Sequence, residues 1–376
     1  MIFNMNLINR LENYQQLLKS KNQFRVLNNN SGIDFCSNDY LGIKNHPQII
    51  KDTQIALDNY GFGAGSSRFI KGEHKYYEKL EYSLADFKQT QKSLLFSSGY
   101  AANIGAICAL IEPGDLVFSD ELNHASIIDA LKLSKASVII FKHCDQDDLT
   151  KKIKENPHKT CKFLISESLF SMDGDIAPLD TYTQIAKEHN LNLIIDESHA
   201  LGLYGKNGAG LVNYFNIQND ILLTTQGLGK AFGSLGGVCA GSELVIQHVL
   251  QKARTLMYST ALPPSILAGI YSALNIVKQG DDLREKLFNN VSFFAASLRG
   301  AIAPPVLYPS PIFPIIIGDS ALCLEIAQKL NNQGFDVKAI RPPTVPINTS
   351  RLRISININH THTQLTSLAQ SINELL

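Results

Sequence analysis

The segment Leu191-Asn192-Leu193-Ile194-Ile195-Asp196-Glu197-Ser198-His199 runs from an apolar stretch into a carboxylate and an imidazole. A short apolar run of this kind is typical of a strand that is buried on both faces of a sheet. Leu179 to His189, just before it, has apolar residues at helical spacing and is long enough to cross from one parallel strand to the next. We therefore expect Asp196 to lie where a buried strand leaves a parallel sheet.

The same alternation of apolar strands and amphipathic stretches begins near residue 92. Further strands are expected at Ser93 to Phe96, Leu116 to Ser119, Ser137 to Phe141 and Phe163 to Glu167. This rhythm predicts an α/β fold with a mostly parallel central sheet. Ligands of such sheets bind beyond the carboxyl ends of the strands, so Asp120, Glu167 and Asp196 are expected to face one cleft.

The length of 376 residues predicts more than one domain. We expect residues 46–280 to form a large ligand-binding domain and residues 281–376 to form a smaller α+β C-terminal domain, because the strand and helix pattern changes near Asp281. Residues 1–45 contain one expected helix and no obvious core of their own. This segment is expected to pack across both lobes or onto a partner chain.

The charge balance points to a small-molecule partner. Lys plus Arg and Asp plus Glu number 34 each, with no long run of either sign, so neither nucleic acid nor a membrane surface is expected as a partner. The 6 cysteines are scattered, as expected for free thiols in a reducing cytoplasm. No signal sequence or membrane span is apparent, so we expect a cytoplasmic protein. His360 and His362 lack a further ligand at a metal-site spacing, so we expect no metal site.

Lys230 lies in the small-residue segment Gly227-Leu228-Gly229-Lys230-Ala231-Phe232-Gly233. An amine that water cannot surround on all sides can act as a nucleophile and form a Schiff base with a carbonyl. The flanking glycines would allow a flat ligand to approach the backbone. Taken alone, the same segment is equally compatible with an ordinary surface lysine in a glycine-rich loop.

Four other positions favour the same chemistry, and each has a structural alternative. Ser97 to Asn103 opens an expected helix and could bind a phosphate, or Ser98 could simply cap that helix. His124 could lie flat on an aromatic cofactor, or make a structural hydrogen bond at a helix start. Asp196 could hold a pyridine nitrogen protonated or be a turn residue, and Arg353, on an expected strand, could clamp a carboxylate or form a surface ion pair.

Together these residues predict a pyridoxal 5'-phosphate (PLP) site. Lys230 would bind the cofactor aldehyde, Asp196 its ring nitrogen, His124 its ring face, the helix start its phosphate, and Arg353 an amino acid substrate.

An ordered series of motifs resembles the α-oxoamine synthase family over nearly the whole chain. The series comprises Ser37 to Gly42, Gly63 to Arg68, Asn123 to Ser126, Ser171 to Asp175, Asp196 to His199, Gly229 to Gly233 and Tyr258 to Thr260. The resemblance implies a PLP-dependent transferase of fold type I, a homodimer with shared active sites, and condensation of an amino acid with an acyl thioester with loss of carbon dioxide.

The resemblance also implies roles for individual residues. Lys230 would hold the cofactor and move the α-proton of the amino acid, His124 would stack on the ring, and Asp196 would bind its nitrogen. The other implied cofactor contacts are Ser98, Gly99, Tyr100, Glu167, Ser171, His199 at the phenolic oxygen, and Thr260 from the neighbouring subunit. The implied substrate contacts are Arg25, Asn38, His124, Thr344 and Arg353.

Gly227 departs from the family pattern, which has Thr or Ser three positions before the lysine as a phosphate ligand. The segment from Asp220 to Lys230 is also slightly longer than usual. We expect either that Thr225 or Thr224 reaches the phosphate through a bulge, or that the cofactor is held less tightly.

Within the family, Ile340 to Pro346 most resembles the branch that condenses L-alanine with pimeloyl-CoA or pimeloyl-carrier protein in biotin biosynthesis. Glycine C-acetyltransferase, 5-aminolevulinate synthase and relatives with long acyl chains share most of the motifs, so these reactions remain alternatives. A non-catalytic partner subunit is a further alternative, which the joint presence of Lys230, Asp196, His124 and Arg353 disfavours.

Overall fold

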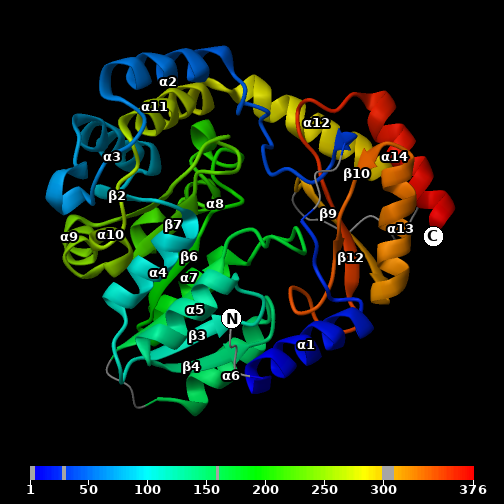
Figure 1. The fold of residues 1–376 in the computed structure, drawn as a ribbon. Coiled ribbons are helices and arrows are strands. Elements are labelled where there is room, and N and C mark those ends of the chain that lie inside the picture. Colours follow the sequence, from blue (N-terminus) through cyan, green and yellow to red (C-terminus); the bar gives the residue numbers. More distant parts are fainter. Residues whose placement is uncertain (1–4, 28–30, 158–160, 299–308) are drawn as a thin grey trace. The chain divides into compact units, whose positions relative to one another are not determined.

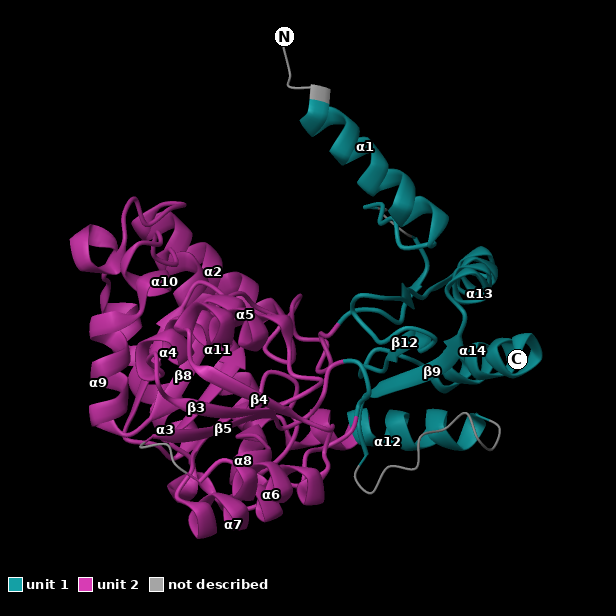
Figure 2. Ribbon diagram, turned by 90° about the horizontal axis from the view of Figure 1, so that it is seen from below, with its two compact units in different colours: residues 1–37, 172–174, 287–376 teal, residues 38–171, 175–286 magenta. Residues whose placement is uncertain are grey.

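The computed structural model describes residues 5–27, 31–157, 161–298 and 309–376. The chain forms two compact units, which Figure 2 shows in different colours. The smaller unit comprises Met1–Ser37, Met172–Gly174 and Leu287–Leu376, and the larger comprises Asn38–Ser171 and Asp175–Lys286. Sequence patterning placed the corresponding boundaries at 45/46 and 280/281, and the packing of residues 1–45 across lobes or onto a partner stays a prediction.

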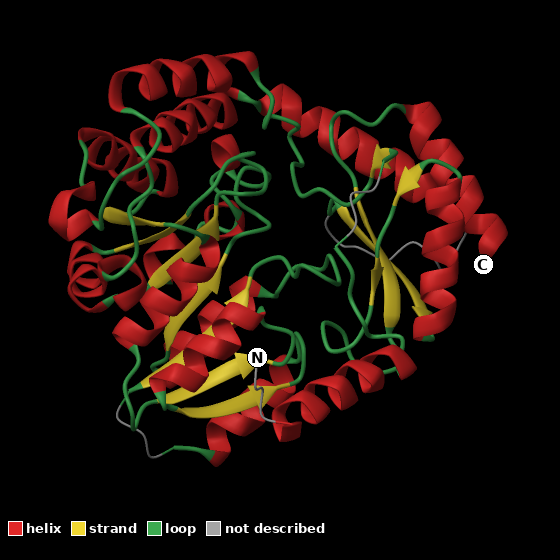
Figure 3. Cartoon of the chain, in the orientation of Figure 1, coloured by secondary structure: helices red, strands yellow, loops and turns green. Residues whose placement is uncertain are grey.

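The larger unit is built on a mostly parallel seven-stranded sheet with the strand order β2-β8-β7-β6-β5-β3-β4 (Figures 1 and 3). Its strands are β2 (Lys92–Phe96), β3 (Leu116–Asp120), β4 (Ser137–Phe141), β5 (Lys162–Glu167), β6 (Asn192–Asp196), β7 (Leu223–Gly227) and β8 (Gly237–Gly241). Strands β3 to β7 pair in parallel, whereas β8 runs antiparallel to both of its neighbours. The predicted α/β fold with a mostly parallel sheet is confirmed.

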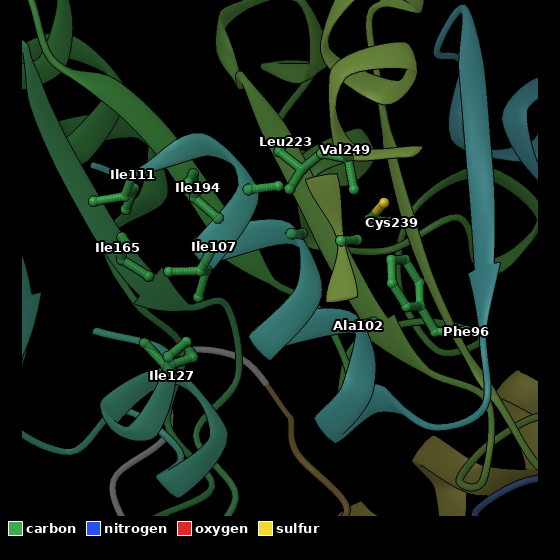
Figure 4. Packing of buried hydrophobic residues seen from close by; sticks show 14 of the residues in the cluster. Phe96, Ala102, Ile107, Ile111, Ile127, Ile165, Ile194, Leu223, Cys239 and Val249 are labelled. Atoms are coloured by element: carbon green, nitrogen blue, oxygen red, sulfur yellow. The ribbon is translucent and has the colours of Figure 1, made fainter. Parts of the chain in front are cut away.

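Helices surround this sheet and bury its apolar side chains. They are α2 (Pro47–Tyr60), α3 (Lys75–Lys88), α4 (Gly99–Leu110), α5 (Ala125–Ser134), α6 (Gln146–Glu155), α7 (Leu179–His189), α8 (Leu211–Tyr214), α9 (Glu243–Lys252), α10 (Arg254–Met257) and α11 (Pro264–Gln279), with the short helices η1 (Arg68–Gly72), η2 (Lys206–Gly208) and η3 (Gln218–Asp220). Helix α4 packs against β7, β8, α5 and α9. Figure 4 shows Ala102 and Ile107 of α4 among the core residues Ile165, Ile194 and Leu223 of the strands. This packing places the first turn of α4 beside the carboxyl end of β7.

The smaller unit has its own sheets and core. A three-stranded antiparallel sheet has the order β11-β12-β9, and a short parallel pair joins β1 to β10. The elements are α1 (Met5–Ser20), β1 (Ile33–Asp34), the part of α12 (Asp281–Ser297) from Leu287 onward, β9 (Ile312–Gly318), α13 (Ser320–Asn332), β10 (Phe335–Asp336), β11 (Ala339–Ile340), β12 (Ser350–Ser355) and α14 (His362–Leu375). In the part of the chain that the structure describes, no helix is both long and apolar enough to cross a membrane.

A buried ion pair lies directly behind the turn that follows β6. Lys88, the last residue of α3, donates from Nζ to Glu197 and to the carbonyl of Ala209, and to Asn213 Oδ1 at 3.1 Å. The other carboxylate oxygen of Glu197 accepts from the N–H of Val212 at 2.8 Å. Both side chains of the pair are almost completely buried. Each charge is therefore compensated by the other and by several hydrogen bonds, as buried charges require.

We expect Lys88→Met to lower the free energy of unfolding by about 3–5 kcal/mol, because it leaves the buried Glu197 carboxylate uncompensated. The measurement is urea unfolding of the full chain. Lys92→Met is the matched control, because it removes an exposed ion pair with Glu243 and should cost less than about 1 kcal/mol. Equal losses in the two variants would contradict the central role of the buried pair.

Candidate active site

A cavity of about 280 Å³ lies in the larger unit at the carboxyl ends of β5, β6 and β7. Eight of the residues predicted from the sequence line it: Asn38, Ser98, Gly99, Tyr100, His124, Glu167, Asp196 and Lys230. The remaining lining residues are Asn103, Ser126, Ser198, Gly227, Gly229, Leu235 and Gly236. Segments far apart in the sequence thus meet where a parallel sheet is expected to bind its ligand.

Asp196 is held in place by hydrogen bonds to both carboxylate oxygens. Oδ1 accepts from the N–H of Ser198 at 2.8 Å, and Oδ2 accepts from Asn103 Nδ2 at 2.7 Å. Asn103 also donates to Ser126 Oγ at 2.9 Å, and its side-chain oxygen Oδ1 accepts from Thr225 Oγ1 at 2.6 Å. This network fixes a carboxylate with a defined orientation in the cavity, as a partner for a protonated ring nitrogen requires.

His124 caps helix α5 and lines the cavity at the same time. Its Nδ1 accepts from the N–H of Ser126 at 3.2 Å and lies 2.7 Å from Ser126 Oγ. Burial lowers the pKa of His124, and the nearby Lys230 acts in the same direction, while Asp196 opposes the shift. The lowered pKa favours the neutral imidazole, which suits stacking on an aromatic ring.

The start of helix α4 also lines the cavity, and the backbone N–H groups of a first helical turn are of a kind that suits an anion. Ser98 caps the helix by accepting from the N–H of Ala101 at 3.0 Å. A Cβ atom on Gly99 would lie 3.0 Å from the Cα of Gly227, so glycine at 99 permits close approach of the two backbones. The N–H of Gly227 donates to Ser198 Oγ at 2.8 Å, which leaves the Ser198 hydroxyl proton for another acceptor.

The two threonines before Gly227 do not line the cavity. Thr225 donates to Asn103, and Thr224 Oγ1 lies 3.5 Å from the carbonyl oxygen of Ala240. Strands β7 and β8 pair in continuous register from Leu223 to Gly227, so the predicted bulge is wrong. Thr225 contributes to the site indirectly, because its hydroxyl holds the Asn103 side chain that donates to Asp196. Ser198, two positions beyond Asp196, is the hydroxyl that sequence reasoning missed.

The other predicted cofactor contacts lie outside the cavity lining. His199 is buried, and its Nδ1 lies 2.8 Å from the Tyr40 hydroxyl, which in turn lies 3.2 Å from Asn38 Oδ1. Ser171 is half-buried and Thr260 is exposed. His199 is thus linked to the cavity through Tyr40 and Asn38.

The remaining predicted substrate contacts belong to the smaller unit. Arg25 Nη2 donates to Thr344 Oγ1 at 2.9 Å, and Arg353 Nη1 donates to Ser355 Oγ at 2.8 Å. All residues of β12 are buried, so Arg353 does not follow the inward and outward alternation expected of its strand. Its guanidinium is a buried cation, which excludes the alternative of a surface ion pair.

The cavity residues fit PLP in the chemistry of their side chains. Lys230 offers an amine, Asp196 a fixed carboxylate, and His124 a neutral ring. The first turn of α4 supplies the free N–H groups and hydroxyls that suit a phosphate.

Comparison with known proteins agrees with this chemistry. The family described as aminotransferase class I and II matches residues 30–372. The putative 8-amino-7-oxononanoate synthase 2 of Bacillus velezensis is 39% identical over 365 residues, which cover 97% of this chain and 92% of the relative.

Two solved structures resemble the chain along most of its length. One is the 8-amino-7-oxononanoate synthase of Francisella tularensis, with a TM-score of 0.78, 32% identity and coverage of 92% of this chain and 97% of that one. The other is a serine palmitoyltransferase variant from S. paucimobilis with bound PLP and myriocin, with a TM-score of 0.91, 26% identity and coverage of 100% and 98%. PLP is therefore the cofactor that the family and the cavity support together.

We expect Ser198→Ala to raise the dissociation constant for PLP about 10-fold, because it removes a hydroxyl donor at the phosphate end. Titration with pyridoxal, which lacks the phosphate, should show no such change. Thr224→Val is the matched control, because its hydroxyl lies outside the cavity lining. Equal weakening for pyridoxal and PLP would contradict a phosphate contact.

Proposed function

The chain belongs to the aminotransferase class I and II family, and we propose that it is an acyltransferase that condenses L-alanine with pimeloyl-CoA or pimeloyl-carrier protein, with loss of carbon dioxide. The product is 8-amino-7-oxononanoate, an intermediate of biotin biosynthesis. The observation that carries the proposal is the meeting of Lys230, Asp196 and His124 in one cavity of a chain that resembles enzymes named for this product.

PLP supplies a ring that withdraws electrons from the α-carbon of an amino acid attached to it. Asp196 would bind the ring nitrogen and stabilise its positive charge. Because Asn103 and Ser198 fix both carboxylate oxygens of Asp196, this charge needs no rearrangement during the reaction. His124, whose pKa is lowered by burial, would pack on the face of the ring.

Lys230 moves the proton at the α-carbon. Its amine lies in the cavity with His124 and Asp196, on the turn that follows β7. As the general base it takes the α-proton of L-alanine, and after the acyl group has been transferred and carbon dioxide lost, it returns a proton to the same carbon. The glycines around Lys230 allow the amine to reach a flat ligand.

The acyl donor and the carboxylate of the amino acid require cations and hydrogen-bond donors. We assign Arg353, Asn38, Thr344 and Arg25 to this purpose. Asn38 lines the cavity and is linked to His199 through the Tyr40 hydroxyl. Arg25 and Thr344 are joined directly, so they would act as one group.

The likeness to serine palmitoyltransferase favours one second candidate, a related condensation that uses another amino acid and a longer acyl chain. The residues of the cavity serve both reactions equally, because they handle the ring and the α-carbon rather than the acyl chain. Product analysis separates the two.

We expect the purified chain with PLP to form 8-amino-7-oxononanoate from L-alanine and pimeloyl-CoA, identified by mass spectrometry. Glycine or L-serine with acetyl-, succinyl- or palmitoyl-CoA should give little amino ketone by comparison. Lys230→Ala should abolish turnover and leave the far-ultraviolet circular dichroism spectrum unchanged, because Lys230 lies in a turn and not in the core. A different ketone would move the assignment to another acyl donor, and substantial turnover by Lys230→Ala would refute the mechanism.

A homodimer is part of the proposal. Phe69 and Ile70 of η1 and Tyr258, which follows α10, are large, exposed apolar side chains. Helix η1 packs against α10, and the N–H of Ala261 donates to the carbonyl of Ser66 at 2.9 Å.

Ion pairs also hold this apolar surface in place, because Arg68 pairs with Glu73 and Glu81. A fixed apolar surface of this kind is typical of a contact between proteins. Thr260, nearby in the sequence, would reach the cofactor of the neighbouring subunit.

We expect Ile70→Asp to convert a dimer of 41.5 kDa chains largely into monomers and to lower activity, because it places a charge in this apolar surface. Analytical ultracentrifugation measures the change. Leu244→Asp on α9 is the matched control, since Leu244 is 80% exposed and Ile70 is 78% exposed. Dissociation by both variants, or by neither, would contradict the assigned interface.

A further inference from the structure

Glu167 and Asp196 place two carboxyl groups side by side in the cavity. Glu167 ends β5 and Asp196 ends β6, and the two residues are register partners in this parallel pair of strands. Neighbours in register leave a sheet on the same face, so both side chains enter the same space. Both are buried and both line the cavity. Two adjacent buried carboxylates repel each other strongly if both are ionised.

The surroundings of the two carboxyl groups are unequal. Both oxygens of Asp196 accept hydrogen bonds, from Ser198 and Asn103. By contrast, Oε1 of Glu167 has no hydrogen-bond partner among the described residues, although it is inaccessible to water. An ionised oxygen in that position would lack both solvent and a donor. Protonation removes the charge that this buried and unpartnered oxygen would otherwise carry, and it gives the carboxyl group a proton to donate.

The charged groups around Glu167 agree with a neutral acid. Burial raises the pKa of Glu167 well above its usual value, and Asp196 and Asp120 act in the same direction. Lys230 and the N–H of His124 oppose the shift without reversing it. Unequal environments for two adjacent carboxyls divide their roles into one ionised group and one proton-bearing group.

We propose that Glu167 is a neutral carboxylic acid whose carboxyl group donates a hydrogen bond to a negatively charged oxygen of the ligand in this cavity. The inference rests on the proposed function for the identity of that ligand. Two oxygens of the required chemistry are available there, the phenolate of PLP and the carboxylate of the amino acid. In either case Asp196 would face a positively charged group of the ligand, and Glu167 would face a negatively charged oxygen of the same ligand.

The test compares Glu167→Gln and Glu167→Ala in the full-length, PLP-loaded protein. Glu78→Gln, an exposed residue of α3, is the matched control. Infrared spectroscopy at neutral pH should show a protonated carboxyl band in the wild type and in Glu78→Gln, and that band should be absent from Glu167→Gln. This readout does not depend on turnover.

Ligand titration locates the acceptor. The Gln amide can donate as the acid does, so Glu167→Gln should bind PLP and L-alanine within about threefold of the wild type, whereas Glu167→Ala should bind about 10- to 100-fold more weakly. Weaker binding of PLP in the absence of amino acid identifies the phenolate. Weaker binding of L-alanine alone identifies the substrate carboxylate.

Three outcomes would overturn the inference: no change for either ligand in Glu167→Ala, equal loss in the Gln and Ala variants, or a carboxyl band that persists in Glu167→Gln. If Glu167→Ala does not fold, the carboxyl band and the ligand affinities of Glu167→Gln still test whether Glu167 is protonated and donates to the ligand. Failure of the wild type to bind PLP would instead overturn the proposed function, and the infrared band would still report the protonation of Glu167.

Discussion

The hydrogen bonds of Asn103 are the constraint on which the site depends. This side chain donates to Asp196 and Ser126 and accepts from Thr225, so one amide joins helix α4 to β6, β7 and the first turn of α5. The same helix begins at Gly99, where it offers its free N–H groups to an anion. One rigid element therefore sets the distance between the anion end of the cavity and its carboxylate. A ligand with a phosphate at one end and a basic nitrogen at the other would suit the chemistry of these two groups.

The turn after β6 divides two adjacent acidic residues between different tasks. Asp196 faces the cavity, whereas Glu197 points into the core and pairs with Lys88. The buried pair contributes little net stability over an apolar substitute, because desolvation offsets its attraction. Its value is positional, since it fixes the backbone from which Asp196 and Ser198 project. The buried ion pair therefore lies where the backbone must hold Asp196 in position. The apolar burial beside it comes from residues such as Ile194 and Leu223.

Sequence periodicity predicted strands β2 to β6 and helix α7, because buried strands and amphipathic helices leave regular patterns. The chemistry of the side chains in their motifs, rather than periodicity, predicted that Lys230, Asp196, His124 and Ser98 belong to one site, and all of them line the cavity. Neither predicted the antiparallel β8, the inclusion of Met172–Gly174 in the smaller unit, or the task of Thr225. These three features depend on which elements pair in space and on the direction in which a side chain leaves its strand. A motif in the sequence contains neither piece of information.

Gly227 shows why a departure from a motif need not mean a missing contact. Without a side chain at 227, the backbone of β7 approaches Gly99 so closely that a Cβ at either glycine would meet atoms of the other segment within 4 Å. Ser198, on the turn after β6, lines the cavity and places a hydroxyl next to Gly227. Its N–H donates to Asp196 and its Oγ accepts from Gly227, so one residue ties the carboxylate end of the cavity to the anion end. The position of a functional hydroxyl is thus set by backbone approach rather than by distance along the chain from Lys230.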